Sequence, residues 1–186
     1  MKKTSPASHL RIFTIGHSTR SLEDLVSMLQ AHGVEQVVDV RKIPRSRHNP
    51  QFNRERLSTQ LPSYGIRYRH QAALGGLRRP RQDSPNTGWR NRSFRGFADY
   101  AGTPAFQHAL KSLRTTAARR PTAILCAEAL PWRCHRSLIA DALTVQGSEV
   151  RHILSASKAY RHRRTPFARL RAGTLVYPAP NRRRSV

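Results

Sequence analysis

Two short apolar runs separated by an amphipathic stretch constrain the fold of this chain more than any other feature. Residues 11–15 and 37–40 each predict a buried β-strand. Between them, the apolar residues of segment 22–32 fall on one helical face, and Ser21 and Gly33 suit the start and the end of a helix. A helix between two buried strands predicts a βαβ unit with parallel strand pairing.

The same alternation continues along the chain. We expect further strands near residues 66–68, 123–126 and 149–153, and helices near residues 55–61, 104–118 and 134–145. This pattern predicts a single three-layer α/β domain over residues 10–155, with a central, mostly parallel sheet of about five strands flanked by helices. Residues 156–186 form a basic C-terminal tail that we expect to be partly disordered or to add an edge strand, near residues 174–177.

The charge of the chain points to polyanionic partners. Lys and Arg number 34 against 10 Asp and Glu, which gives a formal net charge of +24. Counterion release favours binding of such a protein to nucleic acid or to a nucleotide. Net charge alone also raises solubility and nonspecific association, so the partner remains a hypothesis.

The location of the protein is predicted from what the sequence lacks. No apolar run approaches the roughly 18 residues that span a bilayer, and the first residues lack the apolar stretch of a signal peptide. Two cysteines among chemically active residues fit a reducing compartment. We expect a cytoplasmic protein without membrane association, and its oligomeric state is left open.

Both cysteines fall in one turn between a predicted strand and a predicted helix. The segment from Cys126 to Arg136 also holds Glu128, Cys134 and His135. In open α/β sheets ligands bind at the carboxyl ends of strands, and the start of a helix favours an anion. The positive end of the helix dipole also lowers the pKa of a nearby thiol, whereas burial raises that pKa. Each cysteine is therefore a candidate nucleophile or a packing residue.

Polar residues also follow the other predicted strands. His17 and Ser18 follow the first strand, Asp39 and Arg41 close the second, and His152 lies in the last. Because the carboxyl ends of parallel strands share one edge, we expect these residues to converge around one cavity with the cysteine turn. Taken singly, His17 is also explained by backbone capping, and the Asp39–Arg41 pair by a structural ion pair.

The residues of the cysteine turn bear on three other chemistries. A phosphatase-like or rhodanese-like loop needs five residues between Cys and Arg, but Arg133 comes seven residues after Cys126 and the turn has no glycine. A metal site could draw on Cys126, Cys134 and His135 with His17 or Glu128, although closer cysteine pairs are usual. No Walker or dinucleotide motif is present. We assign no metal ligand and leave the cofactor unknown.

The segment 75–96 predicts a long irregular loop in which arginines alternate with aromatic residues. Trp89 and Phe94 lie among arginines such as Arg78 and Arg95. Such a mixture suits stacking on bases and contact with phosphates. A solvated flexible loop is the alternative interpretation.

The chain resembles the bacterial domain of unknown function 488 family over roughly residues 10–155. The matching pieces are Ile15-Gly-His-Ser18, Val38-Asp-Val-Arg41, Pro44-Arg-Ser46, Pro50-Gln-Phe52, Tyr68, Leu74-Gly-Gly76, Phe97-Ala-Asp-Tyr100, Cys126-Ala-Glu128 and Cys134-His-Arg136. Ala101 stands where the family often has Met. The resemblance implies a compact α/β domain and no assigned reaction. It also implies that a recurrent polar set is present here, comprising His17, Asp39, Arg41, Cys126, Glu128, Cys134, His135 and Arg136.

The leading hypothesis is an enzyme-like site for a phosphate-bearing ligand, such as a nucleotide or a nucleic-acid end. Arg41 and Arg136 would hold the anion, with His17, Ser18 and His135 as further ligand-binding residues. Glu128 or Asp39 would act as general acid or base, and Cys126 or Cys134 as nucleophile. The alternatives are a non-catalytic basic RNA- or DNA-binding protein and a thiol or metal sensor.

Overall fold

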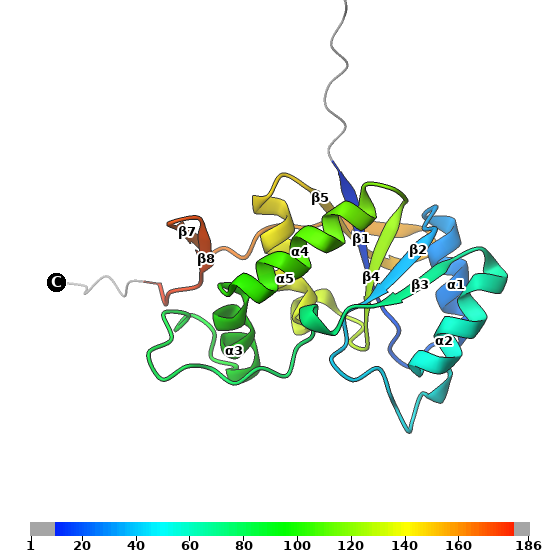
Figure 1. The fold of residues 1–186 in the computed structure, drawn as a ribbon, viewed down its shortest axis with the longest axis horizontal. Helices are drawn as coiled ribbons and strands as arrows, with labels where there is room; N and C mark the ends of the chain where they lie inside the picture. The colour runs from blue at the N-terminus through cyan, green and yellow to red at the C-terminus, as the bar shows by residue number, and fades with distance from the viewer. Residues whose placement is uncertain (1–9, 181–186) are drawn as a thin grey trace, which may run out of the picture.

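The structure, a computed structural model, describes residues 10–180 and is built around one six-stranded sheet (Figure 1). The strand order is β3-β2-β4-β1-β5-β6. The strands are β1 (Arg11–Gly16), β2 (Gln36–Asp39), β3 (Arg67–His70), β4 (Thr122–Cys126), β5 (Glu149–Ser155) and β6 (Lys158–Arg161). All neighbours pair in parallel except β6, which is antiparallel to β5.

The βαβ prediction is right about strand direction and wrong about adjacency. β4 lies between β1 and β2, and Ala123 pairs with Phe13 on one side and Val37 on the other. All five residues of β4 are buried, so this strand is stable only in the middle of the sheet, with a helix layer over each face.

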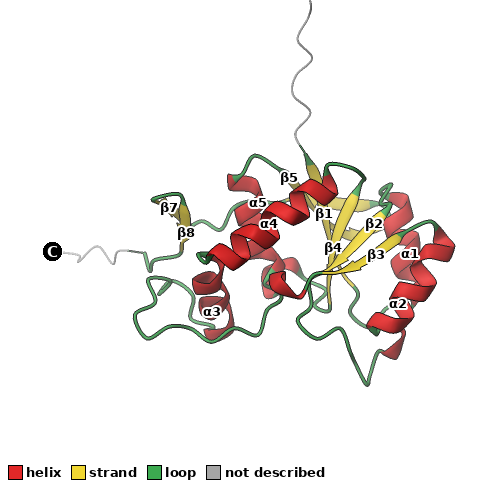
Figure 2. Ribbon diagram, viewed as in Figure 1, coloured by secondary structure: helices red, strands yellow, loops and turns green. Residues whose placement is uncertain are grey.

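Helices cover both faces of the sheet, which confirms the predicted three-layer α/β class (Figure 2). The helices α1 (Leu22–Ala31) and α2 (Arg54–Gln60) pack with Ile15, Val37 and Leu125. The helices α3 (Arg92–Ala101), α4 (Pro104–Ala117) and α5 (Arg136–Val145) pack on the opposite face. Short 3-10 helices span Pro50–Phe52, Leu61–Tyr64, Ala72–Leu74 and Pro131–Arg133.

Local sequence signals explain where several helices begin. The Ser21 hydroxyl accepts a hydrogen bond from the Asp24 amide at 3.0 Å and caps α1. Asn91 caps α3 in the same way through the amides of Ser93 and Phe94. The prediction for the last helix is wrong at its start, because a 3-10 turn and an extended Cys134 delay α5 until Arg136.

The C-terminal segment supplies an edge strand, but at a different place from the one expected. The strand β6 extends the main sheet, whereas residues near 174–177 form a separate hairpin of β7 (Arg169–Arg171) and β8 (Thr174–Val176). Burial explains this difference, since Leu175 and Tyr177 pack into the core beside α3. The expectation of disorder at the very end falls on residues 181–186, outside the described part. Among residues 10–180 no helix combines the length and apolarity needed to cross a membrane.

Candidate functional site

A cavity of about 620 Å³, called the first cavity below, opens at the carboxyl ends of β1, β2 and β4. Of the candidate residues predicted from sequence, those that line it are His17, Ser18, Arg41, Cys126, Glu128, Cys134 and His135. Asp39 and Arg136 lie behind this wall, 0% and 1% exposed. The structure therefore brings the predicted residues to one edge of the sheet, with His152 as the exception, since it lines another cavity.

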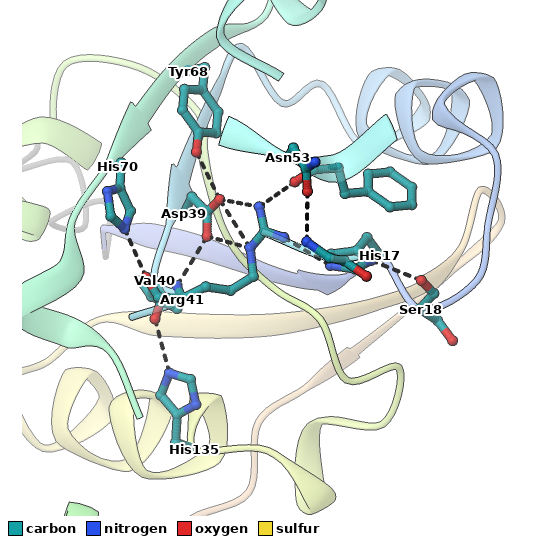
Figure 3. A network of polar contacts seen from close by, with 11 residues as sticks. His17, Ser18, Asp39, Val40, Arg41, Asn53, Tyr68, His70 and His135 are labelled. Carbon is teal, nitrogen blue, oxygen red and sulfur yellow. Dashed lines mark hydrogen bonds and ion pairs between the residues drawn. The ribbon is translucent and has the colours of Figure 1, made fainter. Parts of the chain in front are cut away.

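Asp39 and Arg41 form a buried ion pair with its own hydrogen-bond partners (Figure 3). The Arg41 Nε lies 2.9 and 3.1 Å from the two carboxylate oxygens of Asp39, and the Tyr68 hydroxyl donates to Asp39 at 2.8 Å. A terminal nitrogen of Arg41 also donates to the Phe52 carbonyl at 2.7 Å. These contacts favour the structural ion pair over a catalytic Asp39 and over an Arg41 that holds a ligand.

His17 is held as a neutral imidazole. Its Nδ1–H donates to the Ser18 carbonyl at 2.8 Å, and Nε2 accepts from Arg41 at 3.2 Å, which fixes the tautomer. Its ring stacks on Phe52 with centroids 4.2 Å apart. Burial lowers the pKa of His17 to about 4. Ser18, with φ of 51°, turns its backbone so that its carbonyl reaches this ring.

Arg136 ties the cysteine turn to the sheet. Its guanidinium donates to the carbonyls of Glu128 and Ala129, to the Thr14 hydroxyl at 3.3 Å and to the Cys134 sulfur at 3.4 Å. A Cβ at Gly16 would meet the Glu128 carbonyl oxygen at 1.8 Å, so only glycine allows this close approach. The Arg136 guanidinium thus donates to protein atoms, and its predicted role in holding an anion gains no support from these contacts.

The two thiols of the cysteine turn form a buried pair, and their pKa values are shifted in opposite directions. Cys126 and Cys134 are both free and buried, and their sulfurs lie within 4.8 Å of each other. Interaction with the Cys126 thiol, with His135 and with Arg136 lowers the pKa of Cys134 well below its usual value despite burial. The same interaction between the thiols, together with burial, raises the pKa of Cys126. These opposite directions favour Cys134 over Cys126 as the member of the pair that forms a thiolate.

His135 completes this arrangement. Its Nε2 lies 3.2 Å from the Val40 carbonyl, which can only accept, so Nε2 carries a proton (Figure 3). Its Nδ1 lies 3.7 Å from the Cys134 sulfur. A proton between this sulfur and Nδ1 can rest on either atom, which is the relation of a nucleophile and its base. Gly76 passes close to the ring, because a Cβ there would lie 3.0 Å from Nδ1.

The donor atoms of Cys126, Cys134 and His135 also lie close enough together to hold a metal ion. Within the described part of the chain this group has no fourth protein ligand, and the Arg136 guanidinium lies against the Cys134 sulfur. That buried positive charge opposes a cation at this position. Geometry thus permits a metal ion here, whereas electrostatics favours a lone thiolate.

Three basic side chains that the sequence reasoning did not single out line the first cavity. Lys42, Arg45 and Arg133 are exposed, and within the described residues their side chains make no hydrogen bond or ion pair. The cavity also carries the exposed apolar residues Ile43 and Leu77. Lys42, Arg45 and Arg133 are therefore available to an anionic ligand, unlike Arg41 and Arg136. In the sequence, Lys42 and Arg45 belong to the basic loop after the second predicted strand, and Arg133 directly precedes Cys134. These positions were the features that could have identified them.

A chain of hydrogen bonds runs from Arg136 through the core to Asp141. Thr14 is 2.8 Å from His152, His152 is 2.9 Å from His162, and His162 is 2.8 Å from the Asp141 carboxylate. Arg136 can only donate at one end of the chain and the Asp141 carboxylate can only accept at the other, so the chain links two buried opposite charges.

Lowering the pH from about 7 to 5 will destabilise the protein through His17 and His152. Burial lowers their pKa values to about 4 and about 3. Each stays neutral when folded but takes up a proton below about 6.5 when unfolded, so its contribution is present above that pH and lost below it. Urea denaturation should show a loss of roughly 4 kcal/mol for the two together. A His48→Gln variant, changed at an exposed histidine, should keep the same slope, and a flat profile would contradict these assignments.

The loop before α3 is packed rather than solvated. Trp89 contacts Phe94 and Phe167 with centroids 4.8 and 5.0 Å away, and the Arg78 guanidinium lies 3.6 Å from the centre of the Tyr100 ring. Trp89 of this loop and Phe94 in the first turn of α3 therefore pack against the fold, instead of forming the exposed stacking surface expected from sequence.

Taken together, the fold and the first cavity define an α/β protein with a thiol site at the carboxyl edge of its sheet. Residues 21–143 match the family model described as domain of unknown function DUF488, and the chain belongs to this family. The matched range contains Asp39, Arg41 and the whole cysteine turn, whereas His17 and Ser18 precede it. Comparison with curated proteins gives no match, and neither does comparison with solved structures.

Proposed function

We propose that the first cavity binds a phosphate-bearing ligand, such as a nucleotide or a nucleic-acid end, and that Cys134 is the nucleophile that acts on it. The observation that carries the proposal is a buried thiol whose pKa is lowered by Cys126, His135 and Arg136, at the wall of a basic cavity. Lys42, Arg45 and Arg133 attract the anion, because they have no partner in the described part of the chain.

The remaining residues have roles that follow from their contacts. His135 accepts or returns a proton at Nδ1, and Cys126 stabilises the thiolate through its S–H. Glu128 lines the same cavity with an exposed carboxylate and is available as general acid or base. Ile43 and Leu77 offer apolar contact for the uncharged part of the ligand.

At one pH, the ratio of the alkylation rates of Cys134 by anionic iodoacetate and by neutral iodoacetamide will exceed the same ratio for free cysteine, because the basic side chains concentrate anions in the first cavity. Inorganic phosphate should slow both reactions by occupying that cavity. The Arg133→Ala variant should lose much of the preference for iodoacetate, and Arg47→Ala, also exposed but outside the cavity, should keep it. A rate ratio equal to that of free cysteine, with no effect of phosphate, would contradict the proposal.

The adjacent thiols favour a second candidate function, a thiol sensor. Two free sulfurs within 4.8 Å of each other can be joined in a disulfide by a two-electron oxidant when they move to bonding distance. Peroxide treatment followed by intact-mass measurement distinguishes a thiol sensor from a dedicated nucleophile. A sensor loses two hydrogens reversibly, whereas a dedicated nucleophile is oxidised at Cys134 without joining Cys126.

A further inference from the structure

A second cavity, of about 770 Å³, adjoins the cysteine turn on the side of β5 and β6. Trp132 lines this second cavity and the next residue, Arg133, lines the first. Its wall combines four aromatic and two arginine side chains: Trp89, Trp132, Tyr160, Phe167, Arg161 and Arg163. Most of this lining lies beyond residue 143, outside the range that matches the family.

Two of the aromatic rings are exposed although they are large. Trp132 is 61% and Tyr160 45% exposed, so folding leaves much of their apolar surface in water. The indole N–H of Trp89, at the same cavity, is buried and has no acceptor among the described residues. Flat apolar faces beside an unused donor suit a planar heteroaromatic ligand, which offers both a π-face and hydrogen-bond acceptors.

The charge at the second cavity is entirely positive. No aspartate or glutamate of the described chain lines it. The side chains of Arg161 and Arg163 are exposed and make no hydrogen bond or ion pair within residues 10–180. With a formal net charge of +24 on the whole chain, this wall is complementary to phosphate.

The base of the second cavity is rigid. His152 and His162 line it, and both belong to the hydrogen-bond chain that ends on Asp141. Asp141 also accepts from the Thr165 amide at 2.9 Å and from the Tyr177 hydroxyl at 3.0 Å. A surface fixed in this way loses little conformational entropy when a ligand binds.

We propose that the second cavity binds unpaired bases of a single-stranded nucleic acid, which stack on Trp132 and Tyr160 while Arg161 and Arg163 contact the flanking phosphates. A duplex does not fit this role, because its bases are already stacked on one another. The proposal requires no reaction at Cys134, so it stands or falls independently of the thiol chemistry of the first cavity.

The test is fluorescence anisotropy of a labelled 12-nucleotide single strand with the full-length protein at several salt concentrations. The Trp132→Ala variant should bind about tenfold more weakly, as should Tyr160→Ala, which is the usual effect of losing one stacked base. The matched control is Tyr64→Ala, because Tyr64 is 40% exposed but lies outside the second cavity, and it should bind as the wild type does. Arg161→Ala should weaken binding more than Arg47→Ala, although each removes one positive charge.

A second readout locates the contact. The protein has only two tryptophans, and stacking should quench the emission of the exposed Trp132, a change that Trp132→Ala should abolish. Equal weakening in Trp132→Ala and Tyr64→Ala, or binding without quenching, would show attraction by net charge alone and overturn the proposal. Equal affinity for the duplex, or for a mononucleotide, would overturn it as well. The Cys134→Ser variant should bind the single strand as the wild type does. This result would show that strand binding does not depend on the proposed thiol function.

Discussion

Replacement of Asp39 by Ala will lower the free energy of unfolding by about 3–5 kcal/mol, the usual effect of removing one partner of a buried ion pair. The carboxylate is 0% exposed and accepts hydrogen bonds from Arg41 and Tyr68. Without it, the 7% exposed Arg41 guanidinium keeps its positive charge in the core, and its remaining side-chain partners among residues 10–180 are the Phe52 carbonyl and His17. Urea denaturation at neutral pH measures the loss.

Glu128→Gln is the matched control, because Glu128 is an exposed carboxylate at the same cavity. Surface substitutions usually change stability by no more than about 0.5 kcal/mol, and we expect that range here. If Asp39→Ala were as stable as the wild type, the ion pair would not be structural. Asp39 would then return as a candidate general base.

The strand ends show what the sequence can predict about this site. His17, Asp39 and Cys126 were predicted to share one edge because each follows or ends a strand of a parallel sheet. This rule requires only that the strands run in the same direction, and they do. It does not require the order of the strands, which is why inserting β4 between β1 and β2 leaves the site intact.

The roles of the arginines could not be predicted in the same way. Arg41 and Arg136 stand next to the polar residues in sequence, but their donors are used by Asp39 and by the carbonyls of Phe52, Glu128 and Ala129. Those carbonyls become acceptors only when distant segments pack together. The cationic residues with unused side chains, such as Arg133, are marked in the sequence only by their place beside a strand end or the cysteine turn, and that place does not show which side chains stay unpaired.

The pairing partner of the strand near residues 174–177 could not be predicted for a related reason. The apolar residues near 174–177 predict a strand, and β8 forms there, but its partner is β7 rather than the main sheet. Pairing partners depend on which edge is already covered, and β6 covers the edge of β5. The histidine of this region, His162, has a role only through contact with His152 and Asp141, which local sequence does not show.

Cys134 will react as a thiolate near neutral pH, which is the second large effect that we expect. The Cys126 thiol, the His135 imidazole and the Arg136 guanidinium lie against its sulfur, and together they outweigh burial. The Cys126→Ala variant removes the first of these donors and should raise the apparent pKa of Cys134. Cys134→Ser, which lacks the reactive sulfur, identifies the signal.

The rate of iodoacetamide modification of Cys134 as a function of pH tests the central claim most directly, namely that the turn holds a preformed thiolate nucleophile. We predict an apparent pKa well below the value of about 8.5 for an unperturbed thiol, with modification already at its full rate at neutral pH. An apparent pKa at or above 8.5 would make Cys134 a packing residue and contradict the account.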